Sequence, residues 1–178
     1  MKKGIGMGVF VAVLMALGVL EANAQRRIVP VVQPATLTAA ERAYILQLRE
    51  EEKLARDVYL TLAARWRAPI FSNIAKSESN HMAAVKNLIV RYGLPDPVVT
   101  DTVGVFTNPA FTDLYKQLVA TGSVSIVNAY QVGVVIEELD IKDLIEALSV
   151  VQRADIRTVF TNLLNGSKSH LAAFASHL

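Results

Sequence analysis

Glutamate and histidine stand three residues apart in the segment SESNHM, at Glu78 and His81. In a helix, residues at positions i and i+3 share one face, so the two side chains would point the same way. Ile74, Val85 and Leu88 follow the 3-4 spacing of a core stripe that passes through this pair. In isolation the pair would more often be a surface contact, but on that stripe it supplies two kinds of metal ligand from one buried face.

A second segment, LREEEKLARDVYL, raises the same question. Its apolar stripe runs from Leu48 to Ala55 and passes through Glu51 and Glu52. Both glutamates lie on the arc that their apolar neighbours define, so at least one carboxylate should point inward. Taken alone, the acidic run would be interpreted as a solvated surface.

The segment YQVGVVIEELDIKDLIEAL carries acids on its predicted apolar face as well. Glu137 falls on the stripe, Glu138 is adjacent, and Asp140 follows three residues after Glu137. The stripe itself is defined by Val134, Ile141 and Leu148.

The segment NLLNGSKSHLAAF places His170 in line with Leu163, Gly166 and Phe174. A single histidine there would usually be a hydrogen-bonded core residue. Four helices that each aim an acid or an imidazole at one level would destabilise an ordinary domain severely, because each unpartnered buried charge costs several kcal/mol. A shared cation relieves that cost. Glutamates from two helices with Glu-x-x-His pairs from two others form the di-iron carboxylate pattern, and these ligands suit iron or manganese.

Two of the segments resemble rubrerythrin-like proteins. EEKLARDVY is similar to their first-helix segment, in which a ligand glutamate is followed by arginine four residues later and tyrosine seven residues later. Glu52, Arg56 and Tyr59 match that spacing, which favours Glu52 over Glu51 as the ligand. SESNHM is similar to the second-helix Glu-x-x-His of the same proteins.

The run from about residue 37 to residue 178 resembles the uncharacterised ferritin-like family catalogued as domain of unknown function 2202. The resemblance is carried by REEEKLARDVYLTL, IFSNIAKSESNHMAAVKNLIVRYGL, GVFTNP, IEELDIKDL and NLLNGSKSHLAAF. It implies a ferritin-like bundle with a dinuclear site for two iron or manganese ions, and it implies no particular reaction. The expected ligands are Glu52, Glu78, His81, Glu137, Asp140 and His170.

One departure from the di-iron pattern concerns the last helix, which offers Ser167-x-x-His170 in place of Glu-x-x-His. A hydroxyl is a much poorer ligand than a carboxylate. Ser167 is therefore expected, at most, to contact the metal ligands and not the metal itself. Asp140 could supply the missing charge. Alternatively, the site is asymmetric, holds one metal, or takes a water or an oxyanion. Arg56 could orient a ligand or form a surface ion pair, and Tyr59 could relay an electron or simply pack in the core.

The elements that would position these residues are helices throughout, and strand patterning is weak. The sequence predicts an all-α, ferritin-like four-helix bundle with a short helix in a long connection between helices two and three. A connection of about thirty residues would let helix three run parallel to helix two. Thr38 and Glu41 have the spacing of a capping box, Pro69 should break the chain, and Gly93 is a C-cap. The first predicted helix ends at about Trp66. The next three cover about 72–92, 109–120 and 123 or 125–148, and the last runs from about 154 to the C-terminus.

The first residues, MKKGIGMGVFVAVLMALGVLEANAQ, read as a secretory signal peptide over residues 1–24. Residues 25–36 would then form an extended leader and residues 37–178 the bundle domain, and the chain is expected in the periplasm. Cleavage removes two lysines and one glutamate, so the formal net charge changes from +2 to +1. That balance gives no electrostatic argument for binding nucleic acid. The absence of cysteine excludes disulfides and thiolate catalysis.

Three functions compete at this stage. The first is a periplasmic di-iron or di-manganese protein with oxidase or peroxidase chemistry on dioxygen, peroxide or ferrous iron. The second is a metal-binding module without catalysis, and the third is a metal-free bundle whose acids and histidines pair among themselves. Whether the protein is an enzyme stays open, and so does a homodimer. The expected partners are metal ions and a small oxidant, with no nucleic acid and no membrane span after cleavage.

Overall fold

The computed structural model describes residues 36–178, so the predicted signal peptide and almost all of the predicted leader lie outside the described residues. Within residues 36–178 the secondary structure is entirely helical, which confirms the all-α prediction. No helix in this range is long and apolar enough to cross a membrane. The elements are α1 (Ala39–Trp66), α2 (Pro69–Tyr92), α3 (Pro109–Gly122), α4 (Ile126–Val150) and α5 (Ala154–Ala175).

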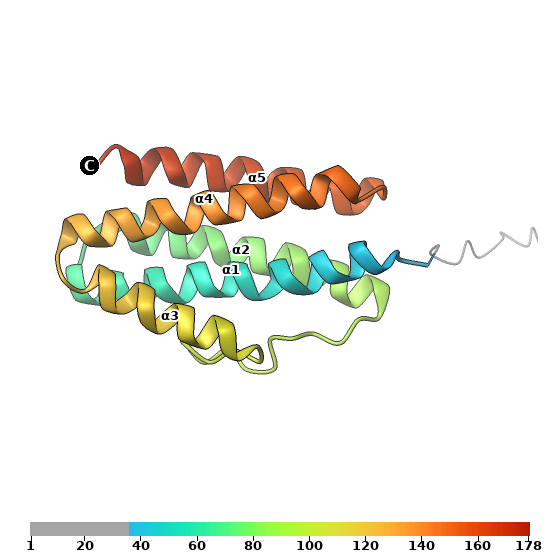
Figure 1. The fold of residues 1–178 in the computed structure, drawn as a ribbon, viewed down its shortest axis with the longest axis horizontal. Helices are drawn as coiled ribbons and strands as arrows, with labels where there is room; N and C mark the ends of the chain where they lie inside the picture. Colours follow the sequence, from blue (N-terminus) through green and yellow to red (C-terminus); the bar gives the residue numbers. More distant parts are fainter. Residues whose placement is uncertain (1–35) are drawn as a thin grey trace, which may run out of the picture. The chain divides into compact units, whose positions relative to one another are not determined.

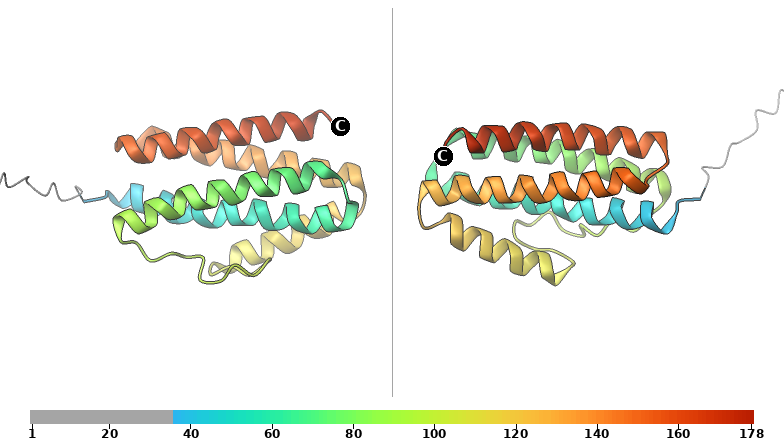
Figure 2. Two further views of the ribbon diagram at one scale, coloured as in Figure 1. Left: turned by 180° about the vertical axis from the view of Figure 1, so that it is seen from behind. Right: turned by 45° about the horizontal axis from the view of Figure 1, so that its top comes forward.

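The four long helices lie side by side, and the shorter α3 flanks them (Figures 1 and 2). Helix α1 packs against α2 and α4, and α5 packs against the same two helices. Helix α3 contacts α1 and α4 along their outer side. The connection over residues 93–108 and α3 together carry the chain back, so α2 and α4 run in the same direction (Figure 1).

Local signals in the sequence account for most helix ends. The capping box is present: the Thr38 side chain accepts from the Glu41 amide, and the Glu41 carboxylate accepts from the Thr38 amide. Gly93 ends α2 in the left-handed region, as predicted. The prediction for Pro69 was wrong in detail, because Pro69 is the first residue of α2 and the break falls before it. Proline suits this position since its missing N–H has no helical partner there.

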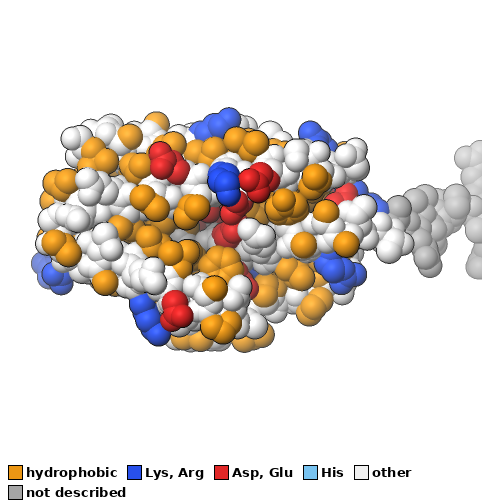
Figure 3. Space-filling model, viewed as in Figure 1, with side chains coloured by type: hydrophobic (Ala, Val, Ile, Leu, Met, Phe, Trp, Pro, Cys, Tyr) orange, Lys and Arg blue, Asp and Glu red, His pale blue; other side chains and the backbone are white. Residues whose placement is uncertain are grey.

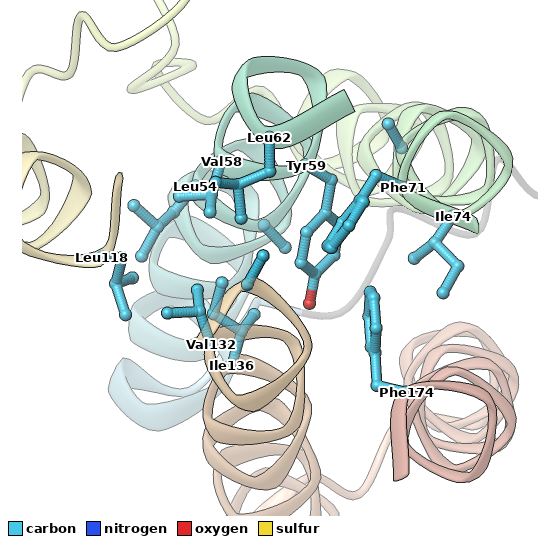
Figure 4. Packing of buried hydrophobic residues seen from close by; sticks show 13 residues of the cluster. Leu54, Val58, Tyr59, Leu62, Phe71, Ile74, Leu118, Val132, Ile136 and Phe174 are labelled. Carbon is cyan, nitrogen blue, oxygen red and sulfur yellow. The ribbon is translucent and has the colours of Figure 1, made fainter. Parts of the chain in front are cut away.

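The apolar core of residues 36–178 forms two clusters. The first cluster contains the rings of Tyr59, Phe71 and Phe174, which lie 5.1–6.4 Å apart between ring centroids (Figure 4). The second cluster contains Leu48, Leu144 and other aliphatic residues from all four long helices, together with the Phe160 ring. The stretch of each long helix that lies between the two clusters carries polar side chains instead.

The stripe predicted for α4 was wrong in its register. Val134, Ile141 and Leu148 are only half-buried, whereas Glu137 and Asp140 are buried as expected. Helix α4 contacts α5, α1 and α3, so its buried arc is wide and the three predicted residues lie at its edge. The residues that fill the arc are Ala129, Val132, Gly133, Ile136, Glu137, Asp140, Leu144 and Ala147.

Candidate metal centre

Ionisable side chains from all four long helices meet in one layer between the two apolar clusters. All of them are buried except His81, which is half-buried. The layer is made of Glu51 and Glu52 on α1, Glu78 and His81 on α2, Glu137 and Asp140 on α4, and His170 on α5.

Glu78 occupies the middle of this layer. Its Oε2 lies 2.8 Å from Nδ1 of His81, and its Oε1 lies 2.8 Å from Nδ1 of His170. A second glutamate faces the same nitrogen of each imidazole: Glu52 Oε2 is 3.1 Å from His81 Nδ1, and Glu137 Oε2 is 3.6 Å from His170 Nδ1. The structure therefore forms two groups with metal-ligand spacing, Glu52–Glu78–His81 and Glu78–Glu137–His170, which share Glu78.

The two imidazoles are stacked, with ring centroids 5.6 Å apart, and both turn Nδ1 toward the carboxylates. The far side of each ring meets the opposite helix. His170 Nε2 lies 3.0 Å from the Ser77 hydroxyl, whereas the His81 ring packs against the backbone of Gly166. A Cβ at Gly166 would stand 2.6 Å from Nε2 of His81, so only glycine leaves room for that ring. Contacts of this kind fix the orientation of a histidine ligand.

Several buried carboxylate oxygens in the layer have no hydrogen-bond partner. Both Glu78 oxygens are among them, because the short contacts with the imidazoles do not have the angle of a hydrogen bond. A buried polar atom without a partner costs about 1–3 kcal/mol, so a cluster of them demands an explanation. A cation in each of the two groups would satisfy the carboxylates of Glu52, Glu78 and Glu137 together with the imidazole nitrogens, and this donor set suits iron or manganese. The unpartnered atoms are Glu51 Oε2, Glu52 Oε1, both Glu78 oxygens, Glu137 Oε2, Asp140 Oδ2 and His170 Nδ1.

The electrostatics of the layer centre on Glu78. Burial raises the pKa of Glu78, but the contacts with His170 and His81 outweigh burial and lower that pKa to about 2. Burial lowers the pKa values of His81 and His170, and the facing carboxylates outweigh burial and raise these values to about 10 and about 9. In the absence of a cation, Glu78 is thus ionised between two protonated imidazoles at neutral pH.

The pKa values of two other carboxyl groups in the layer shift in the opposite direction, upward. Burial raises the pKa of Glu52 to about 8, although His81 opposes the change. Burial also raises the pKa of Asp140 well above its ordinary range, and the charges of Glu52 and Glu137 add to the effect. The layer holds more carboxylates than its own two histidines can neutralise. Two divalent cations would match the charges of Glu52, Glu78, Glu137 and Asp140 if all four were ionised.

Comparison with known proteins places the chain in a family. Residues 41–178 match the family described as "Uncharacterized protein domain (DUF2202)". The chain belongs to this family. The uncharacterized protein MJ0754 of Methanocaldococcus jannaschii is 49% identical over 142 residues, which cover 80% of this chain and 77% of that protein. The crystal structure of hypothetical protein MJ0754 from Methanococcus jannaschii superposes with a TM-score of 0.79 at 49% identity and covers 82% of each chain.

Three further residues that the sequence predicted for the site of this DUF2202 chain lie at the layer but outside the two ligand groups. Tyr59 lies at the layer, and its hydroxyl donates to Glu137 Oε1 at 2.7 Å. Ser167 is buried at the same level, but its hydroxyl donates to the Leu163 carbonyl of its own helix, so α5 contributes no second ligand to either group. Asp140 lies among the carboxylates without belonging to either group.

Two predicted residues of the DUF2202 chain lie away from the layer. Arg56 binds Asp57 at 2.7 Å and Asp101 at 2.6 Å, so it ties the connection between α2 and α3 to α1 and orients no ligand. Glu138, which the sequence places next to Glu137, is exposed and points away from the layer.

The sequence did not reveal the roles of Ser77 and Gly166. Both act across the interface between α2 and α5, and no spacing within one helix could have indicated them.

Proposed function

We propose that this protein is an exported, ferritin-like metalloprotein with a dinuclear iron or manganese carboxylate centre and oxidase or peroxidase chemistry. In this proposal α1, α2, α4 and α5 form a four-helix bundle, and α3 belongs to the long connection. The observation that carries the proposal is Glu78, whose two oxygens each face a different histidine and a different second glutamate. Export is supported by the sequence of residues 1–24 alone.

The ligands divide evenly around Glu78. Glu52, His81 and one Glu78 oxygen would hold the first ion, and Glu137, His170 and the other oxygen would hold the second. Iron or manganese bound there would exchange electrons with a small oxidant such as dioxygen or peroxide. The apolar clusters flank the layer at both of its ends, and Tyr59 holds its proton at the hydroxyl that faces Glu137.

The test is elemental analysis of residues 25–178 purified without chelator, beside the double variant Glu78→Ala/His81→Ala. We expect about two iron or manganese ions per chain in the wild type, and none in the variant. Glu138→Gln is the matched control, because this exposed glutamate should leave the metal content unchanged. Equal metal content in the wild type and the double variant would refute the site, and about one ion per chain would mean that the centre is incomplete at Ser167.

A second candidate is a metal-binding module without catalysis. It is favoured by Ser167, which stands where di-iron proteins have a carboxylate and whose hydroxyl is already bound to its own helix. The two candidates differ in redox cycling. An enzyme should consume many equivalents of peroxide or dioxygen per chain and lose this activity in Glu52→Ala and His81→Ala, whereas a binding module should stop after a single oxidation of its ions.

A further inference from the structure

A cavity of about 140 Å³ lies between α1, α3 and α4, on the side of the metal layer that faces α3. One wall is acidic and consists of Glu51, Asp140 and Asp143. The opposite wall is apolar and includes Phe111 and Leu114 of α3. Figure 3 shows acidic side chains set deep in a hollow of this face, between α4 and α3.

The three acids form a gradient of burial from the surface to the metal layer. The side chain of Asp143 is 20% exposed, and it stands near the mouth beside the exposed Leu139. Glu51 and Asp140 are 9% and 4% exposed. Gln47 connects the first two acids, because its amide lies 2.7 Å from Glu51 Oε1 and 3.5 Å from Asp143 Oδ2.

The inner end of this wall carries oxygens that nothing in residues 36–178 satisfies. Glu51 Oε2 and Asp140 Oδ2 are both buried without a hydrogen-bond partner, and both residues line the cavity. Neither residue belongs to the two ligand groups around Glu78. Yet Glu51 directly precedes Glu52 on α1, and Asp140 lies one helical turn from Glu137 on α4. The charges of Glu52 and Glu137 both act on Asp140, so the inner end of the acidic wall lies near two of the proposed ligands.

We propose that this cavity is the route by which divalent cations reach the metal centre, with Asp143 and Glu51 receiving the cation and Asp140 passing it to Glu52. The inference rests on the proposed function, since it presumes a centre to be loaded. A cation that leaves water needs oxygen ligands at each stage, and the acidic wall supplies them in sequence. On the side of the layer between α2 and α5, the His81 ring packs closely against Gly166.

The charges at the mouth are consistent with this route. Lys142 is the nearby cation, and it lies 3.7 Å from Asp143 and 3.6 Å from Glu146, so its charge is shared between two acids. Asp143 and Glu146 together outnumber Lys142, and an excess of negative charge at a cleft raises the association rate of a cation by about tenfold or more, an effect that weakens as salt is added. Loading should therefore be fast at low ionic strength and slow at high ionic strength.

The experiment measures how fast the metal-free protein takes up Co²⁺, by stopped-flow absorbance at low salt, and how much Co²⁺ it finally holds. In Glu51→Gln and Asp143→Asn we expect uptake to slow by about tenfold or more, with the final content still equal to that of the wild type. Glu138→Gln is the matched control, an exposed acid on α4 that should load at the wild-type rate. Asp143 is partly exposed, so its variant keeps the test valid even where Glu51→Gln fails to fold.

Three results would overturn the route. Wild-type uptake rates in both variants would show that cations enter elsewhere. A lower final Co²⁺ content in Glu51→Gln would mean that Glu51 binds the metal permanently and not only during uptake. A wild-type protein that takes up no Co²⁺ would refute the proposed function itself, and this outcome is distinguishable because it requires no variant.

Discussion

At the scale of single residues, the two histidines of the layer are oriented by different means. His170 is held by a polar contact, because its Nε2 lies 3.0 Å from the hydroxyl of Ser77. His81 is held by close packing against Gly166. Both arrangements leave Nδ1 free to face Glu78. Removing either support should loosen an imidazole without removing a ligand.

Ser77→Ala is expected to weaken the ion at the Glu78–Glu137–His170 group. The hydroxyl fixes the ring through Nε2, and loss of such a partner typically lowers metal affinity by about 10–100-fold. Competition with a chelator of known affinity measures the change. Ser79→Ala is the matched control, since the Ser79 hydroxyl donates only to the Ala75 carbonyl of its own helix. Equal affinities in the two variants would show that Ser77 has no orienting role.

At the scale of helices, the contact between α2 and α5 depends on Gly166. In an open helical position, glycine to alanine stabilises a helix by about 1 kcal/mol. Here the new Cβ would meet the end of the His81 ring at 2.6 Å, so the ring has to move away from Glu52 and Glu78. Gly166→Ala should therefore fold normally and yet lose the ion of the Glu52–Glu78–His81 group, which lowers the metal content from about two to about one.

The control for this variant is Asn165→Ala, which changes the neighbouring exposed residue of α5 and should leave the metal content as it is. Circular dichroism and elemental analysis of both variants separate a folding defect from a site defect. A Gly166→Ala protein with full metal content would mean that the ring has room to shift without leaving the centre.

Glu41 joins the start of α1 to the link between α4 and α5. Its carboxylate accepts from the amides of Thr38, Gln152 and Arg153. Burial raises the pKa of Glu41, but these hydrogen bonds outweigh burial and lower that pKa below its ordinary value of 4.5. A lowered folded-state pKa contributes stability that is complete above the unfolded-state value and is lost as the pH falls through the folded-state value.

Glu41→Gln should accordingly lower the free energy of unfolding by about 1–2 kcal/mol at pH 7. The difference from the wild type should shrink as the pH falls below about 4.5, because the Glu41 carboxylate of the unfolded chain then takes up a proton before that of the folded chain does. Urea denaturation at pH 7 and pH 4 measures both values. Glu146→Gln changes an exposed acid and should show a small difference at either pH. A Glu41→Gln deficit that stays constant between pH 7 and pH 4 would contradict the carboxylate's role.

The helices and the composition of the layer were predictable because their signals are local. The side chains of Thr38, Asn108 and Ser125 each accept a hydrogen bond from a backbone amide two or three residues later, and each cap is visible in the sequence. Contacts between helices were not predictable in the same way. The buried arc of α4 depends on α3 and α5, and Ser77 meets His170 across 93 positions of sequence.

The choice between Glu51 and Glu52 shows both sides of this limit. Helical spacing placed both on one arc, and the resemblance favoured Glu52. The structure places Glu52 beside His81 and turns Glu51 toward the cavity under α3. Whether an inward carboxylate faces the histidines or a cavity depends on how the neighbouring helices pack. The periodicity of one segment carries no information about that packing.

At the scale of the whole domain, the ionisable layer divides one core into two apolar clusters. Each cluster contains residues from all four long helices, so each of these helices crosses the layer on its way from one cluster to the other. A layer with unpartnered carboxylates weakens the connection between the clusters, whereas a layer closed by cations joins them. The stability of the domain should therefore depend on metal.

Removal of metal by a strong chelator is expected to lower the Tm of the wild-type protein by roughly 5–10 °C. An ion that binds only the folded chain stabilises it by about 2.7 kcal/mol when its free concentration is 100 times the Kd, and each kcal/mol shifts the Tm of a domain of this size by about 2–4 °C. Scanning calorimetry with and without chelator measures the shift, and Glu78→Ala/His81→Ala should show none. An unchanged wild-type Tm would favour the metal-free alternative, in which Glu78 is satisfied by the two imidazoles alone. The short contacts from His81 and His170 make that alternative physically reasonable, so this measurement decides between the two.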